Sequence, residues 1–302
     1  TGATGSLGGA IIAALAEQHS VTRIVALSRD EVKSGELAER FSHVPALRCM
    51  LGDVRDGVRL AQVLRGCDTV IHAAALKRVA QSVYSPSEMI KTNIWGTMEV
   101  IQAATDVGAT RVLGVSSDKA VEAVNLYVMT KGVAESYAVQ SNSYAYPRGT
   151  RVSCVRYGNV LGSRGSVVHV WREQFRRGLP LTLTDLAMTR FILTLSQAAA
   201  FCLAMLDSME GGEVFVPRLP AAALSTLAHA VVGERMGVAT GGAIASRYGK
   251  AITGLRPGGE KLHEALISRE EPARTHFGDR RTDELMVILP SHHSWRAEWK
   301  IP

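Results

Sequence analysis

A run of apolar and β-branched residues at positions 111–115 ends in a cluster of polar side chains, and this junction constrains the fold more than any other stretch of the chain. Short apolar runs of this kind are typical of strands that are buried on both faces of a parallel sheet. Doubly wound sheets bind their ligands at the carboxyl ends of such strands. We therefore predict that Ser117, Asp118 and Lys119, which follow the run, lie at a binding site.

Tyr127 and Lys131 stand four residues apart in the same stretch, and residues 132–139 are compatible with a helix. Residues four apart in a helix lie one turn apart on one face. Taken alone the pair also fits a solvated helix face, but folding does not require so many ionisable groups at a strand end. A phenol with a pKa of about 10 accepts protons at neutral pH only when a neighbouring cation stabilises its anion. We predict that Lys131 lowers the pKa of Tyr127, and that both residues are catalytic together with the polar cluster before them.

The composition limits the class of protein. A chain of 302 residues with 46% hydrophobic content suffices for one large domain or a two-lobed unit. The net charge of +6 permits acidic partners, but the 34 basic residues are spread along the chain. A small anionic substrate explains this charge as well as nucleic acid does, and the sequence contains no nucleic-acid-binding motif. We expect a small-molecule substrate and no nucleic acid.

The cysteines and the apolar segments indicate a cellular compartment. Cys49, Cys67, Cys154 and Cys202 are isolated and form no Cys-x-x-Cys motif, which is typical of buried thiols in a reducing compartment. The longest apolar stretch, at residues 191–206, is too short to span a bilayer, and no signal peptide is visible. We predict a soluble cytoplasmic protein without a metal site and without membrane insertion.

The chain opens on a glycine-rich motif followed by a helical pattern of apolar residues. Its glycines permit a tight turn and a close approach of the backbone to a pyrophosphate at the amino end of the helix. Such a motif normally follows a strand. Because the sequence begins inside the motif, we infer that the chain is truncated and that the central strand of the sheet is missing. The cofactor contacts predicted here are Gly2, Thr4, Gly5, Ser6, Leu7 and Gly8.

The strand predicted at residues 23–27 ends in Ser28 and Arg29, about 20 residues after the glycine motif. An acidic residue at this tip would bind the ribose hydroxyl of NAD, whereas Ser followed by Arg suits the 2′-phosphate of NADP. We prefer NADP, although the adjacent Asp30 leaves NAD open. Further cofactor contacts are predicted where later strands end in small or acidic residues. These contacts are Asp53, Val54, Ala73, Ala74 and Ala75, together with Tyr127 and Lys131.

Strands and helices alternate along the first half of the chain, which predicts an α/β fold with a doubly wound parallel sheet of the Rossmann type. After residue 160 the alternation weakens, and we expect a smaller substrate lobe there. The predicted division is 1–159 for the NADP-binding domain and 160–302 for the substrate lobe. The lobes interleave, because the apolar run at 213–216 reads as a strand that returns to the main sheet.

Taken together, the motifs resemble an extended short-chain dehydrogenase/reductase, specifically the inverting UDP-N-acetylglucosamine 4,6-dehydratases of pseudaminic acid synthesis. The resemblance covers nearly the whole chain. The pair Asp118 and Lys119 discriminates best, because sugar epimerases and reductases of the superfamily usually lack it. This sequence departs from the family pattern at Ala123, at Val128, at the extra glycine of 258–259 and in a glycine-rich insertion at 239–250. The motifs that carry the resemblance are residues 1–8, 28–31, 52–56, 72–77, 91–94, 117–131, 156–166, 188–191 and 256–264.

The resemblance implies a dehydratase that uses NADP⁺ catalytically. Tyr127 would take the proton of the sugar 4-hydroxyl, steadied by Ser117, while hydride leaves C4. Lys119 would then remove the C5 proton, Asp118 would protonate the departing 6-hydroxyl, hydride would return to C6, and C5 would be reprotonated with inversion. The resemblance also implies a homo-oligomer, either a dimer or a hexamer. The residues that it assigns to the UDP-sugar are Lys77, Asn159, Arg190, Arg256 and Glu260.

Two alternatives stay open at this point. A UDP-sugar 4-epimerase would use the same oxidation by Tyr127 and Lys131, but it has no need of Asp118 and Lys119 for elimination. A non-catalytic NADP-binding regulator of the same superfamily is the second alternative.

Overall fold

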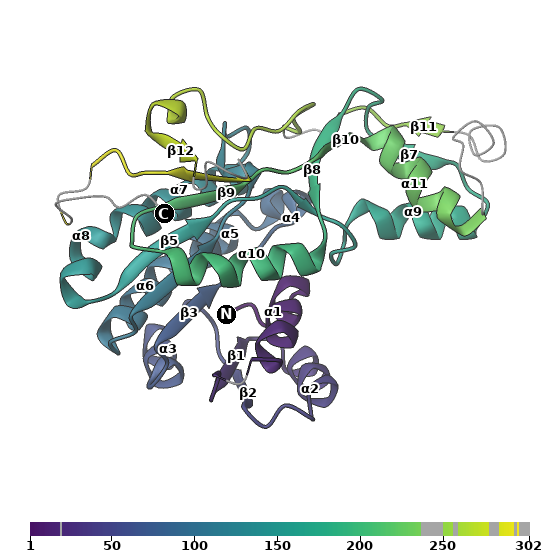
Figure 1. The fold of residues 1–302 in the computed structure, drawn as a ribbon. Helices are drawn as coiled ribbons and strands as arrows, with labels where there is room; N and C mark the ends of the chain where they lie inside the picture. The colour runs from purple at the N-terminus through teal and green to yellow at the C-terminus, as the bar shows by residue number, and fades with distance from the viewer. Residues whose placement is uncertain (19, 237–249, 256–258, 278–283, 293–294, 296–302) are drawn as a thin grey trace.

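Six strands form the main sheet of the computed structural model, which describes residues 1–18, 20–236, 250–255, 259–277, 284–292 and 295 (Figure 1). The strands from β3 to β9 run parallel, and β13 and β12 are antiparallel to their neighbours. The run predicted as a buried strand is β4, and its Val112 and Leu113 are 1% and 0% exposed. In sheet order the strands are β12 (Thr275–Phe277), β13 (Leu285–Ile288), β9 (Val214–Pro217), β5 (Arg151–Val155), β4 (Arg111–Val115) and β3 (Thr69–His72).

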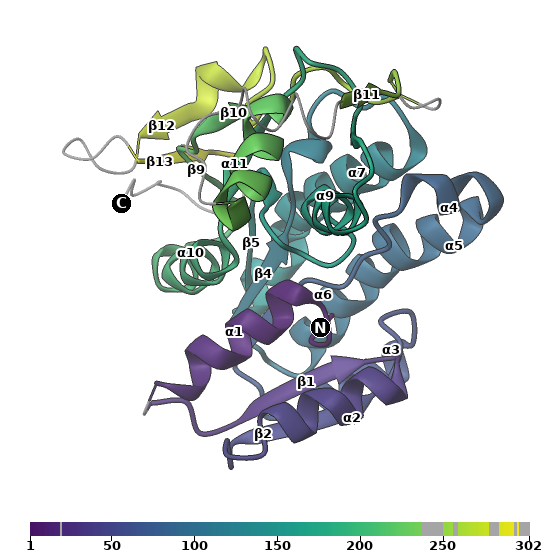
Figure 2. The same cartoon turned by 90° about the vertical axis from the view of Figure 1, so that its right-hand side faces the viewer.

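Helices cover both faces of this sheet, as Figures 1 and 2 show. Successive side chains of β4 point to opposite faces. Val112 packs in one apolar cluster with Leu60 and Val100, and Leu113 packs in another with Ile11 and residues of α10. The predicted doubly wound α/β fold is therefore confirmed. The helices concerned are α3 (Gly57–Leu64), α6 (Gly96–Asp106) and α7 (Leu126–Gln140) on one face, and α1 (Ser6–Ala16) and α10 (Leu195–Ser208) on the other.

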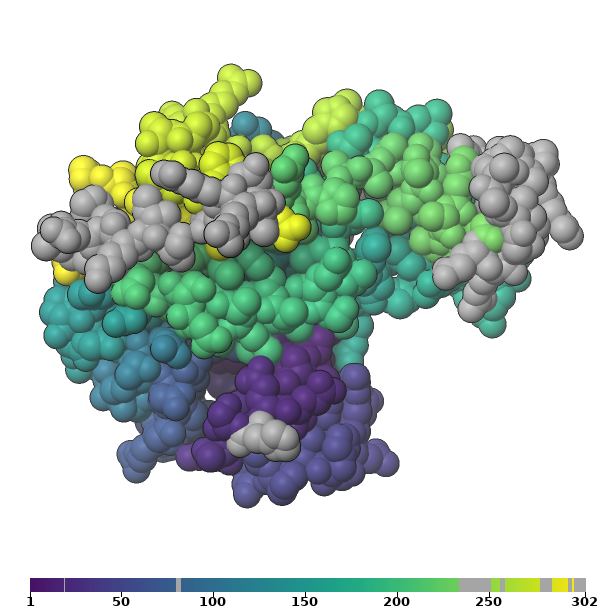
Figure 3. All heavy atoms as spheres, in the orientation of Figure 1, coloured from purple at the N-terminus to yellow at the C-terminus, as the bar shows by residue number. Residues whose placement is uncertain are grey.

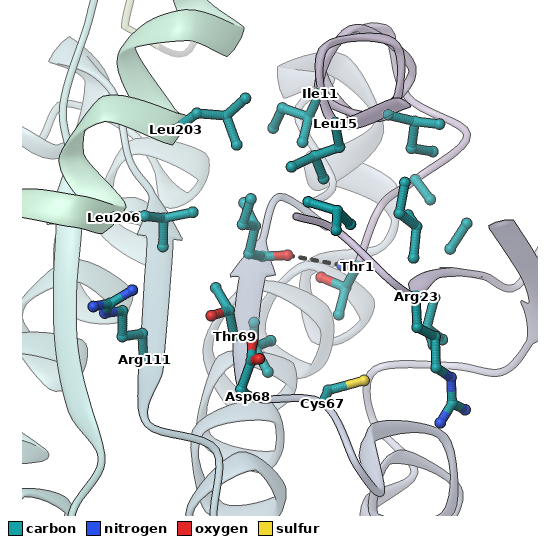
Figure 4. Close-up of a pocket in the computed structure, with 18 of the residues that line it drawn as sticks. Thr1, Ile11, Leu15, Arg23, Cys67, Asp68, Thr69, Arg111, Leu203 and Leu206 are labelled. Carbon is teal, nitrogen blue, oxygen red and sulfur yellow. Dashed lines mark hydrogen bonds between the residues drawn. The ribbon is translucent and has the colours of Figure 1, made fainter. Parts of the chain in front are cut away.

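A separate parallel pair, β1 (Ile24–Ser28) and β2 (Leu47–Leu51), carries α2 (Glu31–Arg40), and β1 lines one cavity together with β3. In the part of the chain that the structure describes, no strand lies between β1 and β3. The start of the chain joins them instead: the amino group of Thr1 donates to Ile71 O at 2.8 Å, and Ala3 N donates to Leu27 O at 3.3 Å. A cavity of about 460 Å³ remains, and its apolar lining includes side chains from α1 and α10 (Figure 4).

A turn of π-helix interrupts the helical region before α6 and fixes the loop after β3. The turn is η1 (Lys91–Trp95), and it follows α4 (Val79–Tyr84) and α5 (Pro86–Ile90). Its buried Asn93 holds the backbone of Leu76 through two hydrogen bonds of 2.7 and 2.9 Å, and donates to Thr130 Oγ1 of α7 at 3.0 Å. Such turns often mark functional sites. Here the turn sets the loop after β3 against the helix that carries Tyr127.

The second lobe projects to one side of the main sheet (Figures 1 and 3). It has its own apolar cluster, centred on the fully buried Trp171. The strand predicted at 213–216 is β9 of the main sheet, whereas the domain division at 159/160 stays a prediction. The elements of the lobe are β6 (Asn159–Val160), α9 (Val167–Arg176), β7 (Leu181–Leu183), β8 (Thr189–Leu193), β10 (Ala221–Ala223), α11 (Leu224–Met236) and β11 (Lys250–Ile252).

Short helices complete the described chain. None of the helices in the described ranges is both long and apolar enough to cross a membrane. The glycine-rich segment at 239–249 lies outside the described residues. The short helices are η2 (Asp118–Ala120), α8 (Asn142–Ala145), η3 (Tyr146–Arg148) and η4 (Glu271–Arg274).

Candidate active site

The polar cluster after β4 forms ion pairs with a segment far along the chain. Lys119 Nζ lies 2.9 Å from Asp118 Oδ1 and 2.9 Å from Glu264 Oε1. Both carboxylate side chains are buried, at 2% and 3% exposure. Lys261 Nζ lies 3.3 Å from Glu264 Oε2 and donates to the carbonyl of Val121. Two acids and two amines therefore alternate in one continuous group, which we call the charged chain.

The local sequence explains how this cluster is presented. Ser117 caps η2, because its Oγ accepts the Lys119 N–H at 3.1 Å, and Asp118 N donates to Tyr157 O at 3.0 Å. Burial raises the pKa of Asp118, and the charge of Glu264 acts in the same direction, whereas Lys119 opposes both. The cluster thus contains a carboxyl group that holds its proton more tightly than an exposed aspartate does.

Tyr127 lies in the first turn of α7, next to this cluster. Asn125 caps the helix by accepting the Val128 N–H at 3.0 Å. Burial, together with the charge of Asp118, raises the pKa of Tyr127 to about 12, although a hydrogen bond with Ser117 acts in the opposite direction. The phenol is therefore neutral in this structure at physiological pH.

The prediction that Lys131 lowers the pKa of Tyr127 is wrong for this structure. Lys131 Nζ donates to the carbonyl of Val115 in β4 at 2.7 Å. Burial lowers the pKa of Lys131, so its charge is itself disfavoured. Helical spacing correctly places both residues on α7, but burial and the charges of Asp118 and Glu264 raise the pKa of Tyr127.

The segment that carries Lys261 and Glu264 is fixed on the loop before α7. Asn125 Nδ2 donates to Gly259 O at 2.8 Å. Gly259 has φ of +88°, and a Cβ atom there would lie 2.6 Å from Val124 O. The glycine that departs from the family pattern is therefore required for this close contact. Val128, another departure, is buried.

The glycine turn before α1 fits a dinucleotide. Gly2 has φ of +69°, and a Cβ atom there would lie 2.7 Å from Ala74 N. At Gly8 a Cβ atom would lie 2.5 Å from Ala3 O, so only glycine allows this packing. Gly5 is the N-cap of α1 and no side chain caps the helix, which leaves the first N–H groups for an anionic ligand. A pyrophosphate has the matching charge.

The tip of β1 presents Arg29 and not Asp30. Arg29 is 52% exposed on its side chain, 3.9 Å from Asp53 Oδ2. Asp53 is held by Arg55 at 2.7 and 2.9 Å, which leaves the charge of Arg29 largely available. Asp30 instead caps α2 by accepting the Lys33 N–H at 3.0 Å, and it also pairs with the Lys33 ammonium.

The other predicted cofactor residues surround this turn. Thr4 Oγ1 is hydrogen-bonded to Ser28 Oγ at 2.9 Å, which links the glycine turn to the tip of β1. Arg164 N donates to Ser6 Oγ at 3.0 Å, so the loop after β6 packs on the start of α1. Leu7 packs against the apolar cluster that contains Leu113. Val54 is buried against Gly96. Residues 73–75 follow β3, and Ala73 and Ala74 lie beside Gly2.

The predicted substrate residues are only partly brought together. Arg190 is buried and donates to three backbone carbonyls at 2.7 to 3.0 Å, and it lies 3.7 Å from Glu260 Oε1. It therefore anchors the segment at 260–262. Asn159 is exposed on β6, beside β8, and burial lowers the pKa of Lys77 after β3. Arg256 lies outside the described residues.

Three residues of the site were not singled out from the sequence. Glu264 and Lys261 close the charged chain, and Arg164 contacts the start of α1. The first two lie in a motif that matches the family, but spacing along the chain could not reveal that they reach Lys119. The glycines around Arg164 at 162 and 165 were the available signal for a tight loop near the cofactor.

Comparisons with known proteins agree on the family. The model of the polysaccharide biosynthesis protein family matches residues 1–283. UDP-N-acetylglucosamine 4,6-dehydratase (inverting) from Campylobacter jejuni is 40% identical over 277 residues, which cover 91% of this chain and 78% of that protein. UDP-glucose 4-epimerase from Rickettsia massiliae is 34% identical over 277 residues, with the same coverage of 91% and 78%.

A solved structure matches the fold over nearly the whole chain. The X-ray structure of Pen from Bacillus thuringiensis superposes with a TM-score of 0.86 at 30% identity, and the match covers 96% of this chain and 86% of that one. The resemblance drawn from the motifs is thus confirmed at the level of sequence and fold. This chain belongs to the polysaccharide biosynthesis protein family, among extended short-chain dehydrogenase/reductases similar to the inverting UDP-N-acetylglucosamine 4,6-dehydratases.

Proposed function

We propose that the protein is an NADP-dependent nucleotide-sugar 4,6-dehydratase that acts on UDP-N-acetylglucosamine or a close relative, with inversion at C5. The observation that carries the proposal is the Lys119 ammonium, held at 2.9 Å from a buried acid next to Tyr127. Elimination of water requires a base and an acid side by side. The similarity to the Campylobacter jejuni dehydratase supports the same activity.

The glycine turn, the uncapped start of α1 and Arg29 are the groups proposed to hold the cofactor. The exposed guanidinium suits a 2′-phosphate, and Asp30 is occupied as a helix cap, which together support NADP over NAD. When bound, the cofactor would supply reversible hydride transfer, which oxidises C4 and later reduces C6 as C5 is reprotonated. Tyr127 and Lys131 are proposed to complete its binding site.

We assign the proton transfers to the residues after β4. Tyr127, neutral in this structure, would take the proton of the 4-hydroxyl as a phenolate, a form that the positive charge of bound NADP⁺ would favour. Ser117, which is hydrogen-bonded to the phenol, orients that hydroxyl. Lys119 removes the C5 proton, which the 4-ketone makes acidic. Asp118, whose pKa burial raises, donates to the departing 6-hydroxyl. Asn159, Arg190, Arg256, Glu260 and Lys77 remain the proposed contacts of the UDP-sugar.

The similarity to a UDP-glucose 4-epimerase favours a second candidate function. An epimerase would also oxidise C4 through Tyr127, but its reaction gives Asp118 and Lys119 no proton to transfer. A product that has lost the mass of one water identifies the dehydratase, and a product of unchanged mass identifies the epimerase. NMR of the product gives the configuration at C5, and light scattering tests the predicted homo-oligomer.

Single-turnover kinetics with UDP-N-acetylglucosamine test the proposed roles. In Lys119→Ala and Asp118→Asn, the absorbance of reduced nicotinamide should still rise while loss of water stops, because oxidation needs neither group. In Tyr127→Phe no reduced cofactor should appear. Dehydration by Lys119→Ala at the wild-type rate would remove the base from this scheme. NADP binding without any reaction of the wild type would favour the non-catalytic regulator.

A further inference from the structure

The side chains of the charged chain alternate in sign, and their formal charges sum to zero. Asp118 and Glu264 flank Lys119, each at 2.9 Å, and Lys261 flanks Glu264 at 3.3 Å on the far side. The Lys261 ammonium is anchored by the carbonyl of Val121. Because both carboxylates are buried, an unbalanced charge here would be strongly unfavourable. The protonation of each member is therefore tied to that of its neighbours.

The ion pairs create a requirement for the elimination step. Lys119 accepts a proton only as a neutral amine, yet in the structure it is shared by two carboxylates. Its direct contact with Asp118 offers a solution, since the N–H bond of Lys119 can break as an O–H bond forms on Asp118. The products of this transfer are a neutral amine and a neutral acid, which are the base and the acid that elimination needs. The step is a proton transfer without oxidation or reduction, and the total charge of the four side chains stays zero.

Lys261 allows this transfer. Once Lys119 is neutral, Lys261, which lies 3.3 Å away, is the cation among the described residues that still pairs with Glu264. Without Lys261, transfer of the Lys119 proton to Asp118 would leave Glu264 as a buried carboxylate with no described cation beside it. Asp118 Oδ1, which lies 2.9 Å from Lys119 Nζ, accepts the proton, while the buried Oδ2 has no hydrogen-bond partner within the described part of the chain.

We infer that Lys261 and Glu264 are positioning residues that let the Lys119 proton move to Asp118 without leaving an unpaired buried charge, an inference that rests on the proposed dehydratase function. Two other groups face Asp118 and affect its charge state: the Arg190 guanidinium from β8 and the Tyr127 phenol from α7. After elimination the C5 proton is on Lys119 and the acid proton has left in water. Both side chains then return to the ion pair seen in the structure.

The test separates oxidation from elimination in Lys261→Met, with Lys261→Arg as the conservative variant and Lys91→Met as a control at an exposed lysine. Single-turnover absorbance of reduced nicotinamide reports the oxidation, and product mass reports loss of water. In Lys261→Met the elimination should slow at least about tenfold more than the oxidation, and Lys261→Arg should recover most of that loss. Equal losses in both steps, or no recovery by arginine, would show a merely structural role and overturn the inference.

A double variant keeps the inference testable if Lys261→Met is poorly folded. Glu264→Gln removes the charge that Lys261 balances, so Lys261→Met/Glu264→Gln should eliminate water faster than Lys261→Met alone. A structural role predicts that the second change lowers the rate further or leaves it unchanged. Thermal unfolding of each variant controls for folding. A wild type that releases no water from any nucleotide sugar refutes the proposed function itself, and that result is distinct from every outcome within the Lys261 series.

Discussion

Replacing Arg156 with methionine should lower the free energy of unfolding by about 3–5 kcal/mol, the usual cost of removing one partner of a buried ion pair. Arg156 follows β5, and its side chain is 3% exposed. It donates to Glu135 of α7 at 3.0 Å, to Glu271 of η4 at 2.8 and 2.9 Å, and to Leu266 O at 2.8 Å. The variant would leave two carboxylates buried without this cation.

The size of the loss should depend on pH. Burial raises the pKa of Glu271, but hydrogen bonds and the charge of Arg156 lower it by more, so its pKa lies below the ordinary value. Without Arg156, the Ser268 N–H and Arg274 still lower the pKa of Glu271, but burial opposes them and the largest lowering contribution is lost. The pKa should therefore rise, and Glu271 should take up a proton more readily. Each unit of pKa change corresponds to about 1.4 kcal/mol, so the loss should be smaller near about pH 5 than near about pH 7.5.

Urea unfolding at the two pH values measures this difference. Arg148→Met is the matched control, because Arg148 pairs with Asp106 at 2.9 Å while the two side chains are 51% and 47% exposed. Such exposed pairs contribute about 0–1 kcal/mol. A loss for Arg156→Met that is no larger than the control, or that does not shrink at the lower pH, would refute the argument.

Three further predictions follow from the same structure. Gly8→Ala places a Cβ atom 2.5 Å from Ala3 O, which distorts the glycine turn, so calorimetric titration should show loss of dinucleotide binding. The free energy of unfolding should fall by about 1–3 kcal/mol. Burial lowers the pKa of His72 to about 3, so the unfolded chain gains a proton below its ordinary value of 6.5 and the folded chain does not. The stabilisation from neutral His72 is therefore fully present above pH 6.5, and the free energy of unfolding falls by on the order of 4 kcal/mol between there and pH 3. In His72→Asn, urea titrations should show a weaker dependence of the free energy of unfolding on pH. Arg29→Glu should weaken NADP binding by about 1.5–3 kcal/mol and NAD binding less; equal losses would remove Arg29 from the site.

Local patterns in the sequence predicted the parts of the fold and site that depend on short stretches. The strand at 111–115, the helix that carries Tyr127 and Lys131, and the glycine turn are all set by neighbouring residues. The contact between Asp118 and Lys119 follows from adjacency at a strand end. Their roles in catalysis stay predictions.

The parts that the sequence could not predict depend on contacts between distant segments. Glu264 joins the site because Gly259 lets its segment approach the loop before α7, and no spacing rule encodes that approach. The direction of the Tyr127 shift was missed for a related reason. The spacing showed a cation one turn away, whereas burial and two acids from elsewhere decide the pKa.

Two hydrogen bonds described above tie the glycine turn to distant segments, and this has a consequence for hydrogen exchange. Thr4 Oγ1 is hydrogen-bonded to Ser28 Oγ at the tip of β1, and Arg164 N donates to Ser6 Oγ at the start of α1. A dinucleotide bound at the turn should therefore slow amide exchange at the tip of β1 and in the loop after β6 together, because local opening of either segment would break its site.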